Sequence, residues 1–73
     1  MGRQISLVEY KNSLESTEQL LGLKVYSIPD EEWYFINYIN GDLIWLGNII
    51  GDKETKGHYI NIKWLTIDPT NLI

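Results

Sequence analysis

The chain of 73 residues contains no cysteine, so no disulfide bond can support its fold. Its length predicts a single small domain over residues 1–73. A domain of this size buries a modest share of its surface and is marginally stable without help. We therefore expect self-association or a permanent protein partner to supply the missing stability.

Positive charge is also scarce, because six basic residues stand against ten acidic ones and give a net charge of −4. Nucleic-acid binding needs a positive field that displaces counterions, so this balance argues against nucleic acid as a partner. No apolar run approaches the roughly 18 residues of a membrane span. The N-terminus lacks a signal-peptide pattern. We expect a soluble cytoplasmic protein that does not bind membranes.

The chain is instead rich in aromatic residues and isoleucine, which gather in three runs at residues 33–39, 43–50 and 58–67. These residue types are typical of strands. Asn40-Gly41 separates the first two runs and favours a two-residue type I′ hairpin turn. A polar, glycine-bounded segment at 51–57 separates the last two runs and is typical of a surface loop. The pattern predicts three consecutive antiparallel strands.

The hairpin turn predicts a register in which Phe35 faces Leu46, and we expect Leu46 to face Ile62 on the next strand. Because side chains alternate along a strand, each face can be listed. We assign one face to the core: Trp33, Phe35, Ile39, Ile44, Leu46, Ile50, Ile60, Ile62 and Trp64. The second face carries Tyr34, Ile36, Tyr38, Leu43, Trp45, Ile49, Tyr59, Asn61, Lys63 and Leu65.

A helix is predicted before the strands, over about residues 7–21. Ser6 and Glu9 have the spacing of a capping box, and Gly22 is a suitable stop. A short strand follows at residues 24–28. Residues 29–39 also carry helix-start features, but their apolar residues surround such a helix, so we favour the strand. The expected fold class is α+β, with one N-terminal helix packed on an antiparallel three- to four-stranded β-meander.

A single helix cannot cover both faces of this sheet, so the second face is predicted to be a contact surface. Aromatic anchors usually dominate the affinity of a protein interface. The predicted partner-binding residues are Tyr34, Tyr38, Trp45, Tyr59 and Lys63.

The chain offers little catalytic or metal chemistry. Its single histidine, His58, follows Asp52 and Glu54 in sequence, but their spacing is not typical of a metal site. Serines and acidic residues are present without a nucleophile motif, and no phosphate-binding loop occurs. We predict no catalytic residue, no metal site and no cofactor.

Three segments, at residues 32–36, 40–47 and 62–69, carry a family resemblance. They read Glu-Trp-Tyr-Phe-Ile, Asn-Gly-Asp-Leu-Ile-Trp-Leu-Gly and Ile-Lys-Trp-Leu-Thr-Ile-Asp-Pro. The chain here resembles the N-terminal half of the GNAT acetyltransferase superfamily. The resemblance implies that the backbone of Leu65, Thr66 and Ile67 lies along the pantetheine arm of acetyl-CoA. The family's glycine-rich pyrophosphate loop is missing from residues 68–73. A weaker resemblance, over residues 28–41, is to the SMI1/KNR4 immunity proteins.

The expected function is that of a non-catalytic protein-binding module. A small acidic regulator or inhibitor of the kind that phages and mobile elements encode fits this description. It would act through the second sheet face or as a homo-oligomer. One alternative is a split half of a GNAT-like acetyltransferase. The other is single-stranded nucleic-acid binding by the aromatic sheet.

Overall fold

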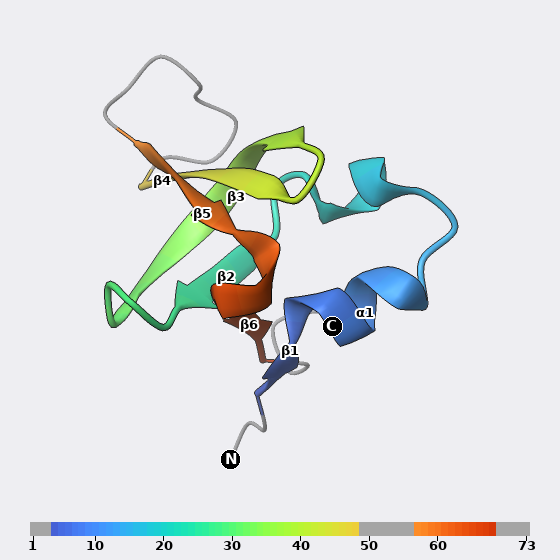
Figure 1. Ribbon diagram of the computed structural model, residues 1–73, viewed down its shortest axis with the longest axis horizontal. Coiled ribbons are helices and arrows are strands. Elements are labelled where there is room, and N and C mark those ends of the chain that lie inside the picture. The colour runs from blue at the N-terminus through green and yellow to red at the C-terminus, as the bar shows by residue number, and fades with distance from the viewer. Residues whose placement is uncertain (1–3, 49–56, 69–73) are drawn as a thin grey trace.

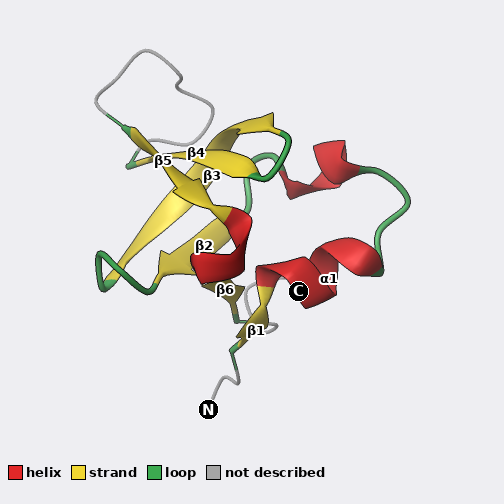
Figure 2. Cartoon of the chain, viewed as in Figure 1, coloured by secondary structure: helices red, strands yellow, loops and turns green. Residues whose placement is uncertain are grey.

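The computed structural model describes residues 4–48 and 57–68, which form a curled antiparallel sheet with a short helical arm (Figure 1). The arm consists of α1 and a 3₁₀ helix, η1, and Figure 2 shows both on one side of the strands. The elements in chain order are β1 (Ile5–Ser6), α1 (Leu7–Asn12), η1 (Thr17–Leu20), β2 (Lys24–Ser27), β3 (Glu32–Asn40), β4 (Leu43–Gly47), β5 (His58–Asn61), η2 (Ile62–Trp64) and β6 (Leu65–Ile67).

The strands lie in the order β1-β6-β2-β3-β4-β5, and every neighbouring pair is antiparallel. β5 and β6 are consecutive in sequence, yet β2, β3 and β4 lie between them in the sheet. Because only the 3₁₀ turn η2 joins β5 to β6, the sheet curls until its two sides approach each other. Ile28 N donates to the Trp64 carbonyl (3.1 Å), and Ile62 N donates to the Asp42 carbonyl (2.8 Å). η2 is thereby bonded to both sides of the curled sheet.

The predicted fold class is therefore wrong, because the sheet has six strands and the α-helix is one short element. The predicted helix over residues 7–21 ends early, with Ser13 as its C-cap. The Ser13 hydroxyl donates to the Tyr10 carbonyl (2.7 Å), a local bond that competes with the helical backbone pattern. Ser6 is the N-cap but makes no side-chain capping bond. The capping box forms instead at Ser16 and Gln19, where it begins η1.

Residues 32–40 form a strand, which confirms the strand over the competing helix. The first hairpin turns one residue later than predicted, which moves the partner of each residue next to the turn by two positions. Asn40 pairs with Leu43, so the two turn residues are Gly41 and Asp42. Gly41 has a φ of +62°, while Asp42 has no positive φ, which is the pattern of a type II′ turn with glycine first. The pairing then shifts at Asn37, where β3 contains a bulge between Ile36 and Tyr38.

The bulge explains why half of the predicted core face of β3 is wrong. One extra residue in a strand exchanges its two faces from that point on. Before the bulge, Ile36 is fully buried and Tyr34 packs against the core, whereas Trp33 and Phe35 lie on the opposite face. After the bulge, Ile39 packs inward as predicted.

The third predicted strand, over residues 58–67, is interrupted by η2. Its first part pairs Leu46 with His58, four residues away from the predicted register. Because four is an even number, the faces of β5 keep their predicted sides. η2 then reverses the alternation, so Leu65 and Ile67 are buried while Trp64 is 46% exposed, the opposite of the prediction for Leu65 and Trp64.

The core lies on the inner side of the curled sheet and under the helical arm. α1 contacts η2 and β6, and it contributes Leu7 to the core, while η1 contributes Leu20. Each of these side chains is fully buried. α1 packs beside β6, whereas η1 packs beside β3. The buried apolar residues are Leu7, Leu20, Val25, Ile36, Ile44, Leu46, Ile62, Leu65 and Ile67.

Candidate functional site

Six aromatic side chains lie on the side of the sheet that faces away from the core. Directly paired residues share a face, so the register places them together. Tyr26 pairs with Trp33 across β2 and β3, and Tyr38 pairs with Trp45 across β3 and β4. None of them belongs to the core or packs against it. We call this surface the outer aromatic face and define it as Tyr26, Trp33, Phe35, Tyr38, Trp45 and Tyr59.

The centre of one half of this face is a row of three rings on three adjacent strands. Trp45 on β4 pairs with Tyr38 on one side and with Tyr59 on the other. The rings of Trp45 and Tyr59 are 4.9 Å apart between centroids and meet edge to face at 73°. Tyr38 and Tyr59 are each 42% exposed, and the neighbouring Leu43 is 43% exposed. The row presents a broad apolar surface with two phenol groups.

The other half of the face is centred on Trp33. The Tyr26 ring meets the Trp33 ring edge to face, with centroids 5.3 Å apart. The Lys24 ammonium lies 5.8 Å from the Trp33 ring centre, within the range of a cation–π interaction. Phe35 pairs with Gly47, which has no side chain to meet the ring. This half therefore adds one positive charge to the aromatic surface.

Three of the five predicted partner-binding residues are brought together, namely Tyr38, Trp45 and Tyr59. Tyr34 lies on the inner side instead, where its ring meets the His58 ring at 5.2 Å and its hydroxyl donates to Glu32 Oε2 (3.1 Å). Burial and the bond to Glu32 raise the pKa of Tyr34. Lys63, the fifth predicted residue, belongs to η2 and not to a strand, and its ammonium lies 5.3 Å from the centre of the Trp64 ring.

The prediction missed Tyr26, Trp33 and Phe35 as members of the face. The alternation within residues 24–27 could have indicated Tyr26, since Val25 and Ser27 are the buried residues of that strand. The bulge that turns Trp33 and Phe35 outward has no comparable signal in the sequence.

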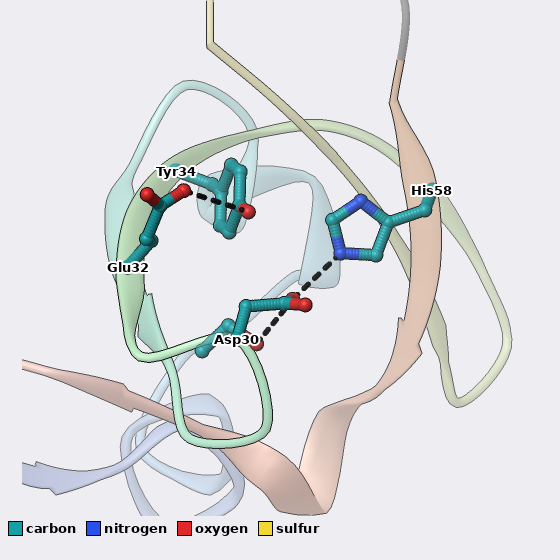
Figure 3. Close-up of polar contacts among 5 residues, drawn as sticks. Asp30, Glu32, Tyr34 and His58 are labelled. Carbon is teal, nitrogen blue, oxygen red and sulfur yellow. Dashed lines mark hydrogen bonds and ion pairs between the residues drawn. The ribbon is translucent and has the colours of Figure 1, made fainter.

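Apart from the outer aromatic face, a polar cluster joins the β2–β3 turn to β5 (Figure 3). Figure 3 shows Asp30 and His58 pointing toward each other from these two segments, and His58 Nε2 lies 2.7 Å from Asp30 Oδ2. The buried Ser27 hydroxyl donates to the same oxygen at 2.8 Å. The bond with His58 has the larger effect and the bond from Ser27 the smaller, and together they hold the pKa of the Asp30 carboxyl below its usual value of 3.8.

Although it contains serine, aspartate and histidine, the cluster does not have the geometry of a hydrolytic triad. In a triad the histidine stands between the other two groups and takes the proton of the serine. Here Ser27 and His58 both bind one oxygen of Asp30, so the histidine does not stand beside the serine hydroxyl as a base. The cluster links β5 to the β2–β3 turn across the curl of the sheet. Asp52 and Glu54, considered above with His58 as metal ligands, lie outside the described residues.

We expect Asp30→Asn to weaken this link and to change the response of the protein to acid. A carboxyl whose folded-state pKa is lowered stabilises the fold above its unfolded-state pKa and loses that effect as the pH falls through the folded-state value. The free energy of unfolding of the wild type should therefore exceed that of the variant by about 0.5–1 kcal/mol near neutral pH, as for a partly exposed pair. The difference should begin to shrink near pH 3.8 and vanish only below the lowered pKa of the folded-state carboxyl. Thermal unfolding across this pH range measures it, and Glu15→Gln is the control. An acid response unchanged in Asp30→Asn would contradict the link.

The residues that the acetyltransferase resemblance assigns to a cofactor lie in β6. Leu65 pairs with Ser27, Thr66 with Tyr26 and Ser6, and Ile67 with Ile5, so strands flank β6 on both sides. The Leu65 and Ile67 side chains point into the core. The role of these residues in binding acetyl-CoA stays a prediction.

Neither the scan against family models nor the searches of curated proteins and of solved structures found a match. Among the described residues, no helix is both long enough and apolar enough to cross a membrane.

Proposed function

We propose that this protein is a non-catalytic protein-binding module, a small acidic regulator or inhibitor that docks through its outer aromatic face. The observation that carries the proposal is the row of Tyr38, Trp45 and Tyr59 on three adjacent strands, turned away from the core. Tyrosine and tryptophan are enriched among the residues that dominate protein interfaces. Their rings are rigid and their polar groups can bond to a partner.

The charge of the chain favours a protein over nucleic acid as the occupant. Lys24 lies over the Trp33 ring of the outer aromatic face, but the chain as a whole has a net charge of −4. Stacking of bases on aromatic rings needs a positive groove that follows the phosphate backbone. A folded protein surface has no such need and can cover the rings with apolar groups.

The proposal predicts that Tyr38→Ala and Tyr59→Ala each weaken partner binding by about tenfold or more, with little effect on folding. The partner is first captured from a lysate of the source cells with the wild type. A parallel capture uses the variant that combines Tyr38→Ala with Tyr59→Ala. The captured protein is then purified, and calorimetry with each variant measures its affinity. The control is Ile28→Ala, because Ile28 is 47% exposed and lies in the β2–β3 turn, outside the face.

Light scattering at several concentrations tests whether the occupant is a second copy of the chain. A dimer that Tyr59→Ala dissociates would support docking through the face by self-association. Affinity for the purified partner that is unchanged in both tyrosine variants would contradict the proposal. So would tight oligonucleotide binding with a steep dependence on salt concentration.

A further inference from the structure

A groove of about 650 Å³ lies between the helical arm and the end of the first hairpin. Lys11, Glu18 and Leu21 line it from the arm, and Tyr38 and Asp42 line it from β3 and the turn that follows. This volume falls within the range of ordinary ligand sites, about 300–1,000 Å³. The groove is large enough for a long side chain with part of its peptide backbone.

The groove has an acidic residue on each of its two walls. Glu18 belongs to η1 and Asp42 to the hairpin turn, and both residues line the groove. Within residues 4–48 and 57–68, neither carboxylate makes an ion pair, and the one facing cation is Lys11. The lining therefore carries one negative charge in excess. A cation entering between the two walls would meet a carboxylate on each.

The remaining lining suits a cation that is flat and partly apolar. Tyr38 is 42% exposed and Leu21 is 49% exposed, so an aromatic ring and an aliphatic side chain both face an incoming group. A guanidinium group stacks on aromatic rings and bonds to carboxylates through its planar fork, and its stem packs on apolar surface. Lysine offers a more strongly hydrated point charge and fits this combination less well.

We propose that the groove binds an arginine side chain presented by a protein partner. This inference rests on the proposed function, because Tyr38 belongs both to the groove and to the outer aromatic face. A partner that covers the face could thus place an arginine over the edge of β3 into the groove. The guanidinium would lie between Glu18 and Asp42, and its stem would pack against Leu21 and Tyr38.

The test uses a blocked hexapeptide with one central arginine, together with its citrulline counterpart, which has the same shape without the charge. Amide chemical shifts of the isotopically labelled wild type are followed during titration with each peptide. We expect saturable shifts at Glu18, Tyr38 and Gly41 with the arginine peptide, and at least tenfold weaker binding of the citrulline peptide. Equal affinity for both peptides, or no saturable binding of the arginine peptide, would overturn the proposal.

A pair of double variants separates the groove from general charge effects. Glu18→Gln with Asp42→Asn removes the two groove carboxylates, and we expect it to weaken the arginine peptide at least fivefold. Glu9→Gln with Glu15→Gln removes the same charge from exposed positions of the arm outside the groove, and we expect it to change little. Equal losses of affinity in both double variants would mean that peptide binding depends only on net charge. That result would refute the proposal that the groove binds arginine.

Tyr59→Ala distinguishes a failure of this inference from a failure of the proposed function. Tyr59 lies on the outer aromatic face but does not line the groove. The peptide titration should therefore be unchanged in this variant while partner binding is weakened. If the wild type binds its partner but not the peptide, the groove assignment fails alone. If Tyr59→Ala leaves partner binding intact, the proposed function fails, whatever the peptide result.

Discussion

Gly57→Ala is expected to lower the free energy of unfolding by about 3 kcal/mol, near the upper end for overfilled sites. A Cβ atom at this position would collide with the backbone oxygen of Leu46, and it would lie 2.9 Å from two atoms of the Trp45 indole. The backbone oxygen belongs to β4 within the sheet, so it cannot move away without disturbing strand pairing. For a domain of this size, the loss corresponds to a decrease of about 12–24 °C in the melting temperature.

Gly41→Ala is the matched comparison, because it makes the same chemical change for a different physical reason. Gly41 has a φ of +62°, and a Cβ there would meet no atom within 4 Å. The expected cost is the strain of a left-handed backbone, about 1 kcal/mol, and asparagine at this position should recover part of it. Calorimetric melting of the two alanine variants measures the difference. A Gly57→Ala protein as stable as Gly41→Ala would show that β4 and the Gly57 backbone do not approach each other so closely.

The same substitution should also disturb the outer aromatic face, since Gly57 packs against Trp45. The Trp45 Nε1 atom is buried and has no hydrogen-bond partner among the described residues. An indole that must shift to accommodate a new methyl group moves the centre of the row. We therefore expect Gly57→Ala to weaken partner binding even in the fraction that remains folded.

Local signals in the sequence were sufficient to predict the central strands. The aromatic and β-branched runs correctly indicated strands at residues 33–39 and in the first part of residues 43–50, where β4 spans Leu43–Gly47, and Gly41 correctly indicated a tight hairpin. On the face of β4, the alternation of Ile44 and Leu46 inward with Trp45 outward is also as predicted. These features depend on neighbouring residues alone, which is why composition and spacing reveal them.

A sequence pattern in which side chains alternate between two faces does not show where that alternation is interrupted. The bulge at Asn37 and the turn η2 each reverse the alternation, so Trp33, Phe35 and Leu65 were assigned to the wrong faces. A bulge bends its strand, and η2 joins the two strands that lie far apart in the sheet, so both interruptions depend on the whole fold. The two-residue strand β1 cannot be predicted from neighbouring residues either, because it pairs with β6 near the other end of the chain.

The candidate site was predicted in part for the same reason. Tyr38, Trp45 and Tyr59 lie in strand segments that keep the expected alternation, and they do meet on one surface. Tyr34 lies before the bulge and turns inward. The groove depends on η1 approaching the hairpin, and the predicted continuous helix over residues 7–21 contains no such approach.

The assignment of β3 can be tested by one core substitution. Ile36 is fully buried and pairs with the fully buried Leu46, although the uninterrupted alternation placed it on the outer face. Ile36→Ala removes buried methyl groups and leaves a cavity, so we expect a loss of about 2–5 kcal/mol. Since a small domain has only about 4–11 kcal/mol of stability, the variant should be largely unfolded at moderate denaturant concentrations.

Ile28→Ala is the control, because it makes the identical change at a side chain that is 47% exposed. Its expected effect is within about 0.5 kcal/mol, and its backbone bond to Trp64 is retained. Urea unfolding followed by tryptophan fluorescence measures both variants. If β3 had no bulge, Ile36 would lie beside Tyr38 on the exposed surface and the two variants would have similar midpoints. A large gap between them would mean that the extra residue at Asn37 exchanges the faces, which is what turns Trp33 and Phe35 outward and extends the outer aromatic face across β2 and β3.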